Sequence, residues 1–69
     1  MDDRDNTRIQ AHLRRTFDNQ SIVMKPRPKQ KDSAEVYVSE EFIGVVFEDE
    51  DEAGSYMFEM AILGEDLDA

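Results

Sequence analysis

The chain has 69 residues, of which eight are Lys or Arg and 17 are Asp or Glu, and its formal net charge at pH 7 is -9. This length predicts one small domain, residues 1–69, with a marginal hydrophobic core. The absence of cysteine excludes disulfides and thiolate metal sites, and a single histidine cannot build a His-rich metal centre. We therefore expect self-association to supply the additional stability that small domains need.

The first ten residues, MDDRDNTRIQ, lack the basic region and the apolar region of a secretion signal. No apolar run in the chain approaches the roughly 18 residues of a membrane span. We expect a cytoplasmic protein that makes no contact with a membrane.

A helix is predicted over about residues 6–17, because Ile9, Leu13 and Phe17 recur at a spacing of four. Thr7 and Gln10 have the spacing of a capping box, in which two side chains bond the free amides of the first turn. A helix this short is not stable alone in water, so its apolar stripe must pack on another element.

Two short segments follow the helix. SIVMK, residues 21–25, is β-branched enough for a short strand. The basic segment of about residues 25–33 contains Pro26 and Pro28, and proline cannot donate a hydrogen bond inside a sheet. We expect an extended connector or a sheet edge here.

From about residue 34 to residue 63 the apolar pattern alternates, which predicts a β-meander. A turn centred on Glu40 and Glu41 would place Val36 opposite Val45, and a second turn is expected within residues 48–55. The predicted fold is α+β, with one N-terminal helix packed on a three- to four-stranded antiparallel β-meander.

The sheet face away from the helix is predicted to be apolar and uncovered. Large apolar patches on small soluble domains usually mark contact sites. We expect this face to bind a second copy of the chain, forming a homodimer, or an unidentified protein partner. Its predicted residues are Tyr37, Phe42, Val46, Met57 and Ala61.

The stretch FEDEDEAGSYMFEM, residues 47–60, predicts a hairpin whose turn uses a positive φ at Gly54. It is not an EF-hand loop, because a count from Asp49 puts Ala53 and Met60 where ligand oxygens belong. Two uses remain open: a weak divalent-cation site, or an acidic docking tip that engages a basic partner, including by imitating nucleic acid. The tip comprises Glu48, Asp49, Glu50, Asp51 and Glu52.

Catalysis is not expected. His12 lies beside the helix stripe, and no serine has the sequence context of an activated nucleophile. The three glycines are scattered, so no phosphate-binding loop and no cofactor are predicted. Nucleic-acid binding is also not expected, because twelve of the 17 acids follow residue 33, where there is no Lys or Arg, and would repel a polyanion.

The stretch from residue 34 to residue 63 resembles a family of short alphaproteobacterial proteins that is classified only as a domain of unknown function. The resemblance rests on an EVY strand, an EFIGV strand, an acidic DEDE turn and a closing MAIL. These motifs are residues 35–37, 41–45, 49–52 and 60–63. The resemblance implies a bacterial cytoplasmic protein and carries over no activity, cofactor or catalytic residue.

Overall fold

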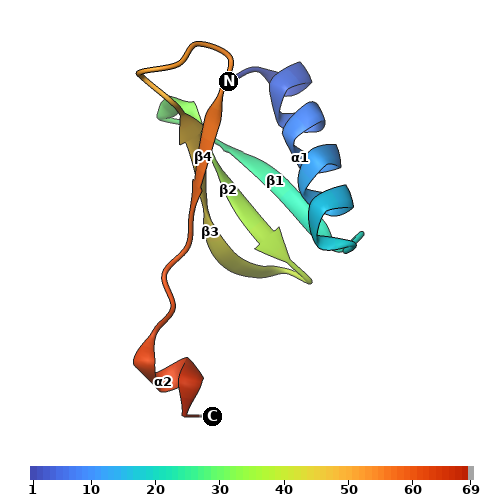
Figure 1. Ribbon diagram of the computed structural model, residues 1–69, viewed down its shortest axis with the longest axis vertical. Helices are drawn as coiled ribbons and strands as arrows, with labels where there is room; N and C mark the ends of the chain where they lie inside the picture. Colours follow the sequence, from blue (N-terminus) through green and yellow to red (C-terminus); the bar gives the residue numbers. More distant parts are fainter. Residues whose placement is uncertain (69) are drawn as a thin grey trace.

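The computed structural model describes residues 1–68 and contains one long helix followed by four strands and a short second helix. The strands form one antiparallel sheet in chain order, β1-β2-β3-β4, and α1 lies beside it (Figure 1). This confirms the predicted α+β fold. The elements are α1 (Asp3–Phe17), β1 (Ile22–Arg27), β2 (Gln30–Val38), β3 (Glu41–Glu48), β4 (Tyr56–Glu59) and α2 (Gly64–Leu67).

Helix α1 begins earlier than the sequence pattern predicts. Asp2 is its N-cap, and the Asp2 carboxylate accepts a hydrogen bond from the Asp5 backbone N–H at 2.8 Å. This bond stabilises the charged form and lowers the pKa of Asp2. The predicted capping role of Thr7 is wrong, because the Thr7 hydroxyl donates to the Asp3 carbonyl inside the helix at 2.8 Å. Asp2 wins because it precedes a first turn that is itself acidic, which the helix dipole favours.

The apolar stripe of α1 is only partly buried. Leu13 belongs to the core and Ile9 packs against it, whereas Phe17 is 56% exposed. The helix ends directly after Phe17, where Asp18 takes the left-handed conformation with a φ of 51°. Phe17 is therefore at the end of the helix and not part of its packed face.

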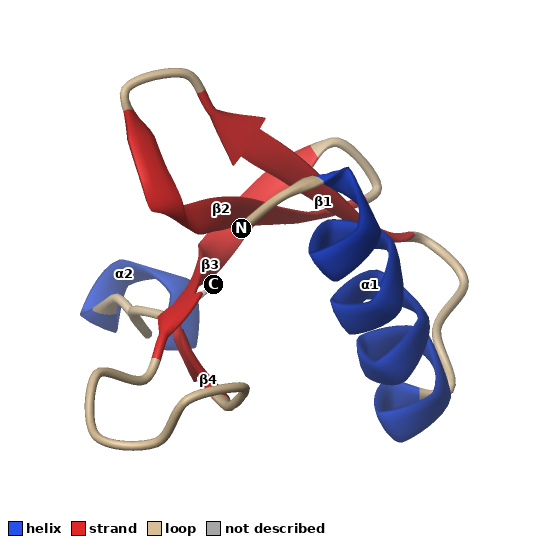
Figure 2. Ribbon diagram, turned by 90° about the horizontal axis from the view of Figure 1, so that it is seen from above, coloured by secondary structure: helices blue, strands red, loops and turns tan. Residues whose placement is uncertain are grey.

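Helix α1 packs chiefly along β1, which is one edge of the sheet (Figure 2). Gln10 accepts a hydrogen bond from the Met24 backbone N–H at 2.9 Å through its Oε1 atom. The Arg14 Nε atom donates to the Ile22 carbonyl at 2.8 Å. These two side chains cover backbone groups that an edge strand otherwise leaves open to other chains.

The basic segment of about residues 25–33 is not an unpaired connector, because most of it belongs to a β-hairpin. Its residues lie in β1 and β2 on either side of a turn at residues 28 and 29. The alternative prediction, a sheet edge, agrees with residues 25–27 in the edge strand β1 but not with residues 30–33, which lie in the inner strand β2. Pro26 is opposite Ala34 on this edge strand, where a missing N–H is tolerated.

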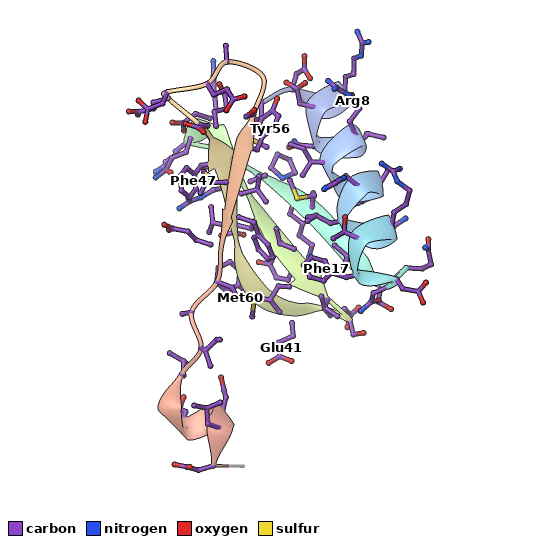
Figure 3. All side chains as sticks on the ribbon, viewed as in Figure 1. Arg8, Phe17, Glu41, Phe47, Tyr56 and Met60 are labelled. Atoms are coloured by element: carbon purple, nitrogen blue, oxygen red, sulfur yellow. The ribbon has the colours of Figure 1, made fainter. Side chains whose placement is uncertain are left out.

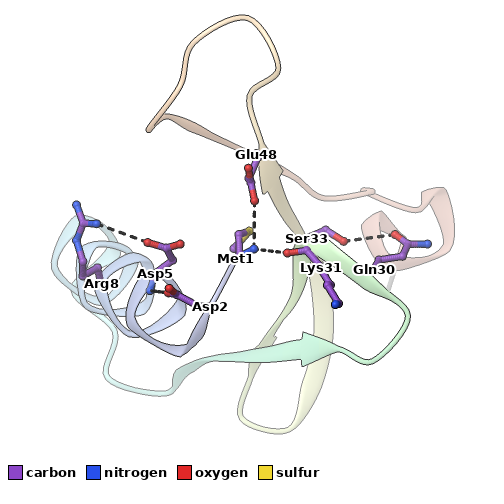
Figure 4. A network of polar contacts seen from close by, with 8 residues as sticks. All are labelled: Met1, Asp2, Asp5, Arg8, Gln30, Lys31, Ser33 and Glu48. Carbon is purple, nitrogen blue, oxygen red and sulfur yellow. Dashed lines mark hydrogen bonds and ion pairs between the residues drawn. The ribbon is translucent and has the colours of Figure 1, made fainter.

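The core lies between α1 and the sheet. Its buried apolar residues are Leu13, Ile22, Met24, Ala34, Val36 and Val46. Met1 packs against this cluster, and its ammonium group donates to the Lys31 carbonyl and to Glu48 Oε2, the latter at 3.1 Å (Figure 4). Met1 thereby joins α1 to the start of β2 and the end of β3.

The register between β2 and β3 differs from the prediction by two residues beside the turn and by one residue beyond Ile43. The turn residues are Ser39 and Glu40, both with positive φ, so Val38 faces Glu41. The ladder then shifts at Ile43, because Val36 pairs with Gly44 while Tyr37 pairs with Phe42. The predicted pairing of Val36 with Val45 is therefore wrong. A one-residue shift moves every following side chain to the other face.

Gly44 follows the shift at Ile43 and lies where β4 passes closest to β3. A Cβ atom at Gly44 would meet the Glu59 carbonyl and would lie 2.8 Å from Phe58 Cε1. Only glycine permits β4 to cross this close to β3. Gly44 lies directly beside the irregular pair, where a glycine inside a strand often accompanies a bulge.

The chain leaves the sheet after Glu59. Residues 60–68, here named the C-terminal segment, lead away from the sheet and include α2 (Figure 1). Four large apolar side chains of this segment are at least half exposed: Met60, Ile62, Leu63 and Leu67. The segment therefore presents its apolar residues to solvent in the single chain.

Candidate contact surfaces

The sheet face away from α1 is built from side chains in three cross-strand rows. The register places Val23, Tyr37 and Phe42 in one row, and Phe47 next to Met57 in another. The row between them, here called the charged row, holds three charged residues, Lys25, Glu35 and Glu59, and one apolar residue, Val45. In Figure 3, Phe47 lies on the side of the sheet away from α1. We name this surface the open sheet face.

Tyr37 is the centre of the contacts on the open sheet face. Its ring meets the Phe42 ring edge to face, with centroids 5.7 Å apart and an interplanar angle of 72°. The Lys25 ammonium lies 4.2 Å from the centroid of the same ring. The Tyr37 hydroxyl donates to Glu35 Oε1 at 3.0 Å, and this bond raises the pKa of Tyr37 above its ordinary value of 10.0, because only the protonated phenol can donate.

The structure places three of the five predicted contact residues on this face: Tyr37 and Phe42, whose rings are in contact, and Met57 in the other apolar row. The placement of Val46 on this face is wrong, because Val46 is 2% exposed and pairs with Ala34 in the core. The placement of Ala61 is also wrong, because β4 ends at Glu59 and Ala61 lies in the C-terminal segment.

Sequence reasoning missed Val45 and Phe47, which replace Val46 on the open sheet face. The sequence pattern does not show the irregularity at Ile43. Beyond that residue, the side chains of β3 that were expected to face the core face the open side, and the reverse. Gly44 was the one local signal, because glycine inside a strand pattern often accompanies a bulge.

The acidic tip forms the connection between β3 and β4. Asp49 accepts a hydrogen bond from the Asp51 backbone N–H at 2.9 Å, and the Asp49 N–H donates to the Ser55 carbonyl at 3.0 Å. Gly54 has a φ of 87°, as the sequence predicts. Glu48 differs from the other acids because it is the last residue of β3 and pairs with the Met1 ammonium.

Among residues 1–68, no three acidic or histidine side chains are grouped closely enough to hold a metal ion. His12 is exposed, and its Nε2 atom lies 3.3 Å from the Thr16 hydroxyl one helical turn away. Across the described part of the chain, no helix is long and apolar enough to cross a membrane.

A second surface was not predicted. Because α1 packs on β1, it leaves an open groove of about 750 Å³ between itself and β4. Ile9, Leu13 and Val46 form an apolar floor, and Tyr56 and Phe58 line the groove from β4. The helix side of this α1–β4 groove also carries Arg8, His12 and Arg15.

The two ends of the α1–β4 groove differ in charge. Burial raises the pKa of Tyr56, and the carboxylates of Asp5 and Glu48 raise it further, so acids surround the groove end near the N-terminus of α1. Arg15 is in the last turn of α1, at the other end. Arg8, His12 and Arg15 are spaced four and three residues apart, which places them on one side of the helix. This spacing was the only signal in the sequence for the helix side of the groove.

Together these features define a small α+β protein with one uncovered sheet face and one groove beside its helix. A family model described as "Protein of unknown function (DUF3126)" matches residues 5–66, and the chain belongs to this family. The expected membership of a family of unknown function is thereby confirmed. No curated protein and no solved structure matches the chain.

Proposed function

We propose that this protein acts by binding another protein molecule and not by catalysis, and that the partner is a second copy packed on the open sheet face. One observation carries the proposal: within residues 1–68 no element covers this face, although it holds the Tyr37–Phe42 ring pair. Phe42 is 51% exposed and Met57 is 49% exposed. Exposed apolar groups of this kind are typical of protein contact sites.

The chemistry of the open sheet face suits a specific interface. Aromatic side chains near the centre of an interface carry most of the binding energy. The charged row between the two apolar rows holds Lys25 together with Glu35 and Glu59. Opposite charges on two copies of such a row would set the relative orientation of the copies and add less to affinity.

Sedimentation equilibrium of the wild-type chain and of Phe42→Glu tests the proposal. We expect twice the 8.0 kDa mass of one chain for the wild type and the single mass for the variant. Phe17→Glu is the matched control, because Phe17 is a similarly exposed aromatic residue that lies outside the sheet. It should keep the wild-type mass.

Two results would contradict the open-face dimer. One is a wild-type chain that stays at 8.0 kDa at all concentrations and at low and high salt. The other is Phe42→Glu with the wild-type mass. Val46→Glu is unsuitable for this test, because it would place a charge in the core and unfold the protein.

The alternative functions stay predictions. An acidic tip that binds a basic partner predicts a pull-down that fails when residues 48–52 become Ser or Asn. A weak cation site predicts amide shifts confined to residues 48–54 at sub-millimolar calcium. The cytoplasmic location and the alphaproteobacterial origin likewise rest on the sequence alone.

A further inference from the structure

We propose that the α1–β4 groove of one chain binds the C-terminal segment, residues 60–68, of a second copy. The inference concerns a second and weaker contact between two copies, and it does not depend on the open sheet face. Phe42→Glu chains should keep this contact, which a disulfide captures although sedimentation gives the mass of one chain. The C-terminal segment would fill the groove that α1 leaves uncovered. The four exposed apolar residues beyond β4 would thereby be buried.

Apolar complementarity is the first support. The groove floor is formed by Ile9, Leu13 and Val46, which belong to or pack against the core. The C-terminal segment exposes Ile62 to 70% and Leu67 to 72%. Among the described residues, half of the large apolar side chains that are exposed belong to these few positions.

Charge complementarity is the second support and is independent of the first. The chain carries a net charge of -9, yet Arg8 and Arg15 lie along the helix side of the groove. The C-terminal segment contains Glu65, Asp66 and Asp68 and no Lys or Arg. None of the described side chains forms a hydrogen bond or ion pair with the Arg15 guanidinium, so it is available to a carboxylate.

The charges also set the direction of the bound segment. At the groove end near Tyr56, the cations Arg8 and the Met1 ammonium are already paired with Asp5 and Glu48, so this end offers little free positive charge to an acid. Arg15 is at the opposite end. Glu65 and Asp66 therefore lie nearest Arg15 in the complex, and the apolar residues at positions 62 and 63 lie on the floor.

The occupant is a second copy and not the same chain, because the C-terminal segment leads away from its own groove (Figure 1). Each copy has one groove and one segment, so a pair of copies can exchange segments reciprocally around a two-fold axis.

Single-cysteine cross-linking tests the inference, since the chain has no cysteine of its own. A mixture of Ala11→Cys chains and ¹⁵N-labelled Ala61→Cys chains is oxidised, and the mixed disulfide is measured by mass spectrometry. Ala11 lines the groove and Ala61 lies in the segment. We expect several-fold more mixed product than from Ala11→Cys with Ala53→Cys, a matched exposed alanine in the acidic loop.

Charge reversal adds a second readout. Arg15→Glu in the Ala11→Cys chain should reduce the mixed product, and Asp66→Arg in the Ala61→Cys chain should restore it. Arg4→Glu is the control, because Arg4 is an exposed residue of α1 that does not line the groove. Equal yields for positions 61 and 53, or no effect of Arg15→Glu, would overturn the inference.

Two further outcomes are decisive. A double variant with cysteines at positions 11 and 61 that closes only within one chain would also overturn the inference, because the occupant would then be the same copy. The cross-link is measured again with Phe42→Glu in both chains. A cross-link that persists there supports the groove without the open sheet face, whereas a dimer that depends on Phe42 and lacks the cross-link overturns this inference alone.

Discussion

At the residue scale, three polar residues of α1 follow one another at a spacing of four, which places them on one side of the helix: Asn6, Gln10 and Arg14. Arg14 bonds the Ile22 carbonyl and Gln10 bonds the Met24 N–H. The next residue of β1 on this side is Pro26, which has no N–H to donate. Asn6, one helical turn before Gln10, has no such backbone donor: it is 8% exposed, and its Oδ1 atom has no hydrogen-bond partner.

Asn6→Leu should stabilise the fold. A buried polar group without a partner costs about 1–3 kcal/mol, and the substitution removes that cost. Leucine is also the better helix former, which adds a few tenths of a kcal/mol in the same direction. We expect the free energy of unfolding to rise by about 1–2 kcal/mol, measured by urea denaturation at a fixed protein concentration.

Gln10→Leu is the matched control for Asn6→Leu. It is a similar change one helical turn later, but here it removes the acceptor of the Met24 N–H and leaves a buried donor unpaired. It should destabilise the fold by about 1–3 kcal/mol. If both variants shift stability in the same direction, the hydrogen bonds along the β1 edge do not explain the difference.

At the scale of elements, the turn between β2 and β3 sets the register of the sheet. Its two residues, Ser39 and Glu40, have φ values of 49° and 71°. Two positive φ values in a two-residue hairpin correspond to a primed turn, which favours Asn and Gly. A residue with a Cβ atom is strained in this conformation.

Glu40→Gly should therefore raise the free energy of unfolding by about 1 kcal/mol, because glycine adopts a positive φ without steric cost. Glu41→Gly is the control: it removes the same charge, but Glu41 is the first residue of β3 and pairs with Val38. Glycine in a strand weakens it, so this variant should be less stable than the wild type. The opposite order in thermal unfolding would favour a turn centred on Glu40 and Glu41.

The sequence was sufficient to predict the helix, the meander and the acidic hairpin, because each depends on local periodicity. The strand β1 was harder, since Pro26 and Pro28 resemble a connector, and its pairing with β2 is a tertiary property. The start of α1 was misplaced because Asp2 and Thr7 are both good caps, and the capping-box spacing of Thr7 was preferred to the acidic first turn that favours Asp2.

The contact surfaces were less predictable than the fold. A turn displaced by one residue and an irregularity at Ile43 together move Val46 from the predicted open face into the core. Alternation of apolar and polar residues does not show at which residue the pairing register between two strands shifts. The α1–β4 groove depends on which strands the helix leaves uncovered, and no local pattern states that.

At the scale of the whole molecule, charge is unevenly distributed. The acidic tip and the acidic C-terminal segment both follow β3, whereas Lys and Arg lie on α1 and the first hairpin. Among residues 1–68 there are two ion pairs, Met1 with Glu48 and Arg8 with Asp5, against 17 acids in the chain. Repulsion between like charges should therefore exceed attraction between opposite ones.

A rise in thermal stability with sodium chloride follows from this balance. The Debye length is about 30 Å at 0.01 M salt and about 10 Å at 0.1 M. The molecule measures 38 × 23 × 23 Å, so at low salt the acids act on one another across the whole domain, and at the higher concentration only near neighbours interact. We expect the melting temperature, followed by circular dichroism, to rise by a few degrees over this range, since net charge destabilises the compact state.

Two variants determine whether repulsion is the cause of that rise. Glu50→Gln, Asp51→Asn and Glu52→Gln together remove three exposed charges from the acidic tip, and should raise the melting temperature at low salt and reduce its salt dependence. Lys29→Gln with Lys31→Gln removes two exposed cations from the first hairpin and should have the opposite effect. Protein concentration is held constant, because dimer formation also raises the melting temperature. A melting temperature that falls with salt in the wild type would mean that the two ion pairs outweigh the repulsion.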